Sequence, residues 1–137
     1  MTNRTLASWL ASVGGWAAAY GFLFAASRDN HPNATLNACA TLLFVLFSAG
    51  AASLNRNWLW PGLWSRGRRV AYAGALLGTV GLVTLLVVAS IRGVYLLLWY
   101  DDPRMFGFWT NVGLDFVVVS ALVAGSAGLG GVAGRLR

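Results

Sequence analysis

Long runs of apolar residues, separated by shorter polar stretches, dominate the chain. Four runs approach or exceed the about 20 residues that a helix needs to cross a bilayer, namely 6–26, 34–54, 70–91 and 113–134. Three of them carry no charge, and the fourth carries only Asp115. None alternates polar with apolar residues as a membrane barrel strand does. Because lipid cannot hydrogen-bond the backbone, we expect four helices that satisfy their own backbone groups.

Polar and aromatic residues fill the connections between these runs. A polar stretch, 27–33, follows the first run, and 55–69 follows the second, with Pro61-Gly62 predicted to break it in the middle. Tryptophan and tyrosine flank the runs, as they do at membrane interfaces. The sequence therefore predicts an all-α integral membrane protein. It has one membrane domain, 1–137, with four transmembrane helices in a small bundle and interfacial, aromatic-rich connections.

The third run has no clear end. Apolar residues continue past Arg92 as far as Tyr100. A helix over 70–100 would measure roughly 46 Å at about 1.5 Å per residue, against a hydrocarbon core of about 30 Å. Three alternatives stay open: the helix is strongly tilted, it projects beyond the lipid, or it ends at Arg92-Gly93 and a second piece lies at the surface.

Composition supports lipid as the solvent of this chain. Of the 137 residues, 58% are hydrophobic and 10% are charged, whereas a soluble domain carries about 25% charged residues. All ten basic residues are arginine and all four acidic residues are aspartate. This bias is typical of GC-rich prokaryotic genomes, so we expect the cytoplasmic membrane of a prokaryote.

The arginines predict the orientation. With the N-terminus inside, seven arginines fall on the cytoplasmic side and three on the outer side, which places both termini in the cytoplasm by the positive-inside rule. Arg66, Arg68 and Arg69 adjoin the third run and are predicted to contact anionic headgroups. Membrane topology explains this cluster better than nucleic acid does, so no nucleic-acid partner is predicted.

Asp115 is the one ionisable group inside a predicted span. An unpaired charge in lipid is costly, so such a residue is a candidate for function. Asp115 lies near the outer end of the fourth helix and Arg92 near the outer end of the third. We expect the two to form an intramembrane ion pair or Asp115 to meet outer water, with a proton or cation site as the alternative.

Catalytic and metal chemistry find little support. The sequence has no nucleophile elbow, no phosphate loop and no metal-spaced cluster, and His31 is its only histidine. We therefore predict no enzyme activity, no metal and no required cofactor, while bound lipid or pigment stays open. Cys39 cannot form a disulfide within the chain, and its apolar surroundings predict a buried thiol.

Small residues recur at the four-residue spacing that lets helix backbones approach closely. Helix-packing positions are predicted at Gly74, Gly78, Gly125, Gly130 and Gly134. They favour packing within the bundle, with packing against another subunit as the alternative. Together with the absence of an evident polar row through any span, they predict an accessory, structural subunit of a larger membrane complex, such as a respiratory or photosynthetic one. Its partners would be the bilayer and other membrane subunits; the alternative is a small homo-oligomeric transporter or channel.

Overall fold

The computed structural model describes residues 3–98 and 107–135, with side chains described for 9–98, 107 and 109–126. It is 91% helix, and the described residues contain no strand. The elements are α1 (Asn3–Ala26), η1 (Arg28–Asn30), α2 (Ala34–Leu54), η2 (Asn55–Trp64), α3 (Arg69–Leu97) and α4 (Phe108–Arg135). Four helices of the described chain are long and apolar enough to span a membrane, which confirms the predicted all-helical architecture.

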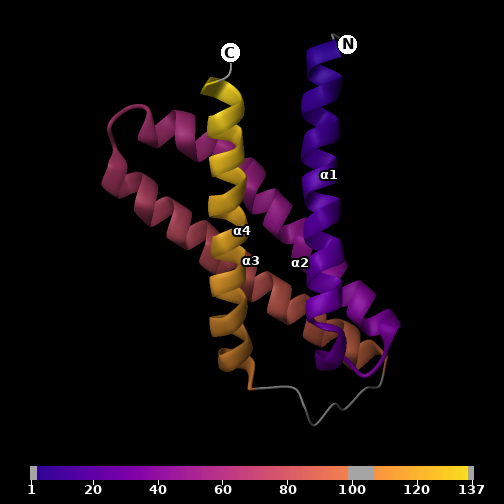
Figure 1. Ribbon diagram of the computed structural model, residues 1–137. Helices are drawn as coiled ribbons and strands as arrows, with labels where there is room; N and C mark the ends of the chain where they lie inside the picture. Colours follow the sequence, from indigo (N-terminus) through magenta and orange to yellow (C-terminus); the bar gives the residue numbers. More distant parts are fainter. Residues whose placement is uncertain (1–2, 99–106, 136–137) are drawn as a thin grey trace.

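Two pairs of helices cross each other (Figure 1). α1 and α4 run roughly upright in the view, while α2 and α3 form a long hairpin that crosses behind them obliquely. α2 contacts α1, α3 and α4, and α4 also contacts α3. Both chain termini lie at the same end of the molecule as the turn between η2 and α3. We call this end of the molecule the terminal end. The opposite end, which contains a cavity, is called the cavity end.

The predicted break at Pro61-Gly62 is wrong. α2 passes directly into η2, a π-helix that carries Pro61 in its interior, and the chain turns only after Trp64. Proline lacks an N–H and its ring crowds the carbonyl four residues back in an α-helix. The wider winding of a π-helix, whose bonds join residues five apart, accommodates it, and Ser65 N donates to Trp60 O at 3.1 Å. Gly67, with φ of 76°, makes the turn itself.

The third helix does not end at Arg92-Gly93. α3 continues without interruption to Leu97, so the surface piece that would follow an end at Arg92-Gly93 is ruled out for this stretch. Trp99 and Tyr100 lie outside the described residues. α3 has 29 residues and is nearly as long as α2 and η2 together, which have 31. Two helices of this length exceed a core of about 30 Å unless they tilt, and they are the oblique pair of Figure 1.

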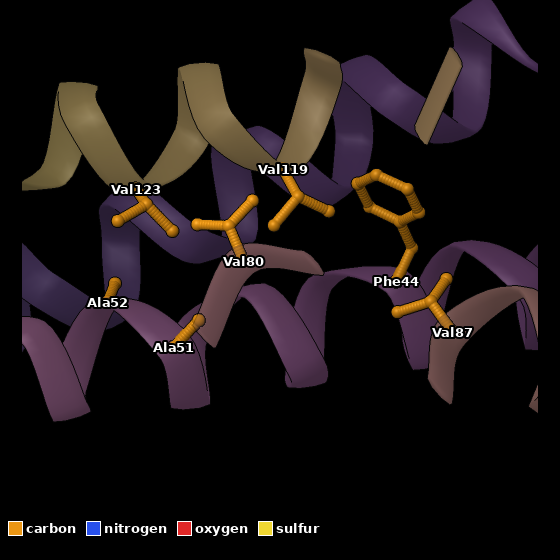
Figure 2. Packing of buried hydrophobic residues seen from close by; sticks show 7 residues of the cluster. All are labelled: Phe44, Ala51, Ala52, Val80, Val87, Val119 and Val123. Carbon is orange, nitrogen blue, oxygen red and sulfur yellow. The ribbon is translucent and has the colours of Figure 1, made fainter. Parts of the chain in front are cut away.

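The hydrophobic core lies where α4 crosses the α2–α3 hairpin. Val119 and Val123 of α4 point at Val80 of α3 and at Ala51 and Ala52 of α2 (Figure 2). Phe44 and Val87 extend this cluster toward the cavity end. Small side chains on α2 let the three helices approach closely. α1 contributes less, and Trp9, Leu10 and Phe22 on it are exposed.

Cys39 is exposed on α2, so the prediction of a buried thiol is wrong. The apolar run that contains it presents one face to the bundle and another outward. Leu42 and Leu46 share that outward surface and are 49% and 59% exposed. Apolar character of a run therefore does not fix burial within this protein.

Candidate functional site

A hydrogen-bond network fixes the cavity end of the bundle, where α1 gives way to α2. Asn33 caps α2 through its side-chain oxygen, which accepts from Leu36 N at 2.8 Å. Asn37, only 1% exposed, donates to Phe24 O at 2.8 Å. The Ser27 hydroxyl lies 2.7 Å from both Leu23 O and Asn37 Oδ1, and its single proton is donated to one or the other. The end of α1 is thereby held against the first turns of α2.

A cavity of about 540 Å³ lies beside this network. α1 and α4 form its opposite walls, and α2 and α3 form its floor. Polar side chains line it from η1, α2, α3 and α4 and from the residue after α1, among them Ser27, Asp29, Thr41, Arg92 and Asp115. Its apolar lining consists of Leu23, Ala26, Ala40, Phe44, Val88, Ile91, Leu114 and Val118. The cavity is thus amphipathic, with ionisable groups and apolar walls facing one space.

Asp115 and Arg92, the two residues predicted to pair, both line this cavity. Asp115 comes from the α4 wall and Arg92 from the α3 floor, and both side chains are partly exposed. The structure therefore brings them to one site, at the same end of the bundle. The ion pair between them stays a prediction. Asp29, in η1, adds a second carboxylate that sequence reasoning did not assign to this place.

His31 and Tyr95 close one side of the cavity. His31 Nδ1 and the Tyr95 hydroxyl lie 2.5 Å apart and share a hydrogen bond, although 64 residues separate them in the chain. Tyr95 is buried, at 3% exposed. This bond ties the loop before α2 to the last turns of α3. Among the described residues no group of three or more potential ligands could hold a metal ion.

A row of buried polar side chains runs along one face of α2, contrary to the expectation that no span carries one. Asn37, Thr41, Ser48 and Asn55 are all at most 4% exposed. Their spacings of four, seven and seven residues keep them on one helix face, and 18 residues of helix cover about 27 Å. Thr84 of α3 is also fully buried and donates to Val80 O at 2.8 Å. Ser48 Oγ is buried and has no hydrogen-bond partner among the described residues.

An aromatic cluster closes the row at the terminal end. Tyr72 donates from its hydroxyl to Asn55 Oδ1 at 2.9 Å. Its ring meets Trp60 and Trp64 edge-on, at 5.8 and 5.3 Å between centroids. The Arg69 guanidinium lies 5.4 Å from the Trp64 ring centroid. Arg66 and Arg68 are exposed beside it, and their contact with headgroups stays a prediction.

The glycines predicted to pack helices have no neighbour within the chain where the structure describes them. A Cβ added at Gly74, Gly78 or Gly125 meets nothing within 4 Å beyond its own helix. All three are exposed. Gly130 and Gly134 belong to α4, but their surroundings lie outside the described side chains. No described part of the bundle packs closely against these three glycines, and their role in helix packing, within the chain or against another subunit, stays a prediction.

No protein-family model, curated protein or solved structure matches this chain.

Proposed function

We propose that the protein is an accessory subunit of a larger membrane assembly, spanning the cytoplasmic membrane of a prokaryote four times with both termini in the cytoplasm. Four apolar helices of sufficient length support the membrane location. Both termini and the arginine-rich turn at Arg66 and Arg68 share one end of the molecule, which supports the orientation under the positive-inside rule.

The open glycine face of α3 carries the proposal of an assembly. Gly74 and Gly78 are four residues apart and exposed, and nothing that the structure describes in another helix lies within 4 Å of where their Cβ atoms would be. α4 presents a similar face with Ala121 and Gly125, both exposed. In lipid, small residues at this spacing favour close backbone packing between helices. Because no described part of the chain covers these faces, a helix of another chain is the partner that fits them.

Two other features of the sequence, the length of the third apolar run and the lack of an evident polar row, no longer favour an accessory role. The α2–α3 hairpin runs obliquely to α1 and α4, and tilt of a helix within the bilayer accommodates excess length, so the length of α3 alone does not call for a partner. The polar row on α2 removes the argument that no span is polar enough for transport. The proposal therefore depends on the glycine faces.

Purification from native membranes in mild detergent tests the proposal. We expect the protein to co-purify with chains of different sequence in a fixed ratio, and those chains, with any pigment, would identify the complex. A monomeric species in mild detergent and in native nanodiscs would contradict the assembly.

A second function, transport as a homo-oligomer, is favoured by one observation. The polar row on α2 leads from the cavity at Thr41, past Ser48, to Asn55 at the terminal end. In this structure the core cluster, including Phe44, Val80 and Val119, packs beside the row. Transport would therefore require these helices to separate.

Flux measurements in proteoliposomes separate the two functions. If the protein transports, proton or alkali-cation flux driven by a membrane potential should exceed that of empty vesicles and should fall when Ser48→Leu fills the row. A homo-oligomer with such a flux would favour the second function. A hetero-oligomer with none favours the first.

A further inference from the structure

The cavity between α1 and α4 has the charge and the shape of a ligand site. Two carboxylates, Asp29 and Asp115, face it together with one guanidinium, that of Arg92. With His31 neutral, the described ionisable groups on its wall sum to one negative charge. We propose that this cavity binds an amphipathic organic cation, whose charged group faces Asp29 and Asp115 and whose apolar body lies against Phe44 and the aliphatic wall.

Electrostatics sets the sign of the ligand. In a site of low effective dielectric, charges a few ångströms apart interact more strongly than they do in water. Among the described residues on the wall, both carboxylates attract a cation and only Arg92 opposes it, whereas an anion meets the reverse. Arg28, next in sequence to Asp29, is exposed and is absent from the cavity lining. The positive charge of Arg28 therefore does not cancel the excess negative charge inside the cavity.

Shape and lining set the size and the character of the ligand. A volume of about 540 Å³ falls within the about 300–1,000 Å³ of pockets that bind drug-sized molecules. The apolar residues come from all four helices and include Leu23, Val88, Ile91 and Leu114. The aromatic residues Phe44 and Tyr95 also line the cavity, and aromatic rings attract cations. A small, fully hydrated cation would leave these walls uncovered.

Part of the cavity lining lies at the surface of the bundle. The cavity lining includes Ala26 on α1 and Leu114 on α4, both of which are exposed. We therefore expect a ligand dissolved in the outer leaflet to enter the cavity beside these two residues. The proposal does not depend on the assembly, because all lining residues belong to this chain.

Tetraphenylphosphonium and tetraphenylborate give a matched test, because they have nearly the same size and shape and opposite charge. Binding of each to the detergent-purified protein would be measured by equilibrium dialysis. We expect tetraphenylphosphonium to bind at least ten-fold more tightly than tetraphenylborate. Equal binding of the two ions would show an apolar cavity with no preference for cations and would overturn the proposal.

Charge variants locate the site. Asp115→Asn should weaken tetraphenylphosphonium binding about ten-fold, equivalent to about 1.4 kcal/mol. Asp29→Asn, at an exposed position outside the four long helices, should weaken it several-fold and serves if Asp115→Asn fails to fold. Arg92→Gln should instead tighten binding several-fold, an effect that a merely structural arginine would not produce. Arg28→Gln is the matched control and should change the affinity less than two-fold. Wild-type affinity in both aspartate variants would contradict the proposal.

Discussion

Tyr72 of α3 donates a 2.9 Å hydrogen bond from its hydroxyl to Asn55 Oδ1, at the junction of α2 and η2. Both residues are buried, at 8% and 3% exposed. The bond fixes the register of the α2–α3 hairpin at the terminal end, as the His31–Tyr95 bond does for α3 at the cavity end. A buried acceptor that loses its donor costs more than the bond itself contributes.

Tyr72→Phe should therefore destabilise the protein. The substitution keeps the ring against Trp60 and Trp64 and removes only the hydroxyl. The loss of stability therefore comes from the buried Asn55 Oδ1, which loses its donor. We expect a loss of about 1 kcal/mol in the free energy of unfolding, measured by titration with sodium dodecyl sulfate. Tyr20→Phe is the control, because Tyr20 is only partly buried and its ring stacks on Phe24. Equal effects of the two changes would contradict this assignment.

Asn37→Leu should loosen α1 from α2. The substitution removes the donor to Phe24 O and the acceptor of the Ser27 hydroxyl, at a site that is 1% exposed. We expect a loss of about 1–2 kcal/mol in the free energy of unfolding and faster proteolysis of α1. Asn57→Leu, at an exposed asparagine whose amide reaches only Ser53, should change stability by less than about 0.5 kcal/mol. A small effect of Asn37→Leu would show that α1 is held mainly by apolar packing.

Cysteine labelling on intact cells tests the orientation. Cys39 is exposed and must first be replaced by serine. Asn30→Cys at the cavity end should react with a membrane-impermeant maleimide, whereas Arg66→Cys at the terminal end should react only after permeabilisation. Both positions are exposed. Arg66 is a better site than Gly67, whose positive φ disfavours a side chain. The opposite labelling pattern would invert the proposed topology.

Much of the fold could be predicted from apolar run length alone. α2 begins and ends at the predicted residues, and α1 and α3 come within a few residues of theirs at most ends. Pro61 misled the prediction, because proline stops an α-helix but fits a π-helical turn that no local pattern announced. α4 begins at Phe108, several residues before the predicted start.

The cavity could be predicted only in part. Asp115 could be identified as a charged residue within an apolar run. Arg92 could be identified because it is predicted to lie at a similar depth in the membrane. Asp29 and His31 gave no signal, since their proximity depends on how η1 folds over the bundle. The polar row did have a signal. Asn37, Thr41, Phe44, Ser48, Ala51 and Asn55 alternate at spacings of four and three residues, the pattern of a buried helix seam.

Ser48→Ala tests whether the Ser48 hydroxyl takes part in transport or has only a structural role. Ser48 Oγ is buried with no hydrogen-bond partner among the described residues, and an unsatisfied buried hydroxyl is costly. If the protein is an accessory subunit, removing the hydroxyl should leave stability unchanged or raise it by up to about 1 kcal/mol and should leave assembly intact. Thermal unfolding and co-purification measure both. Loss of proton or alkali-cation flux in a variant of normal stability would instead place Ser48 on a transport path.

The double variant Gly74→Leu/Gly78→Leu, analysed by native mass spectrometry from mild detergent, tests the assembly most directly. Leucine is a better helix former than glycine by almost 1 kcal/mol, and a Cβ at either site meets nothing within 4 Å. The variant should therefore fold at least as stably as wild type. Ala73→Leu is the control, because Ala73 is exposed on α3 but about 100° around the helix from Gly74. We predict that the wild type and the control retain partner chains and that the double variant inserts but migrates alone. A double variant that keeps its partners, or a wild type that has none, would contradict the account.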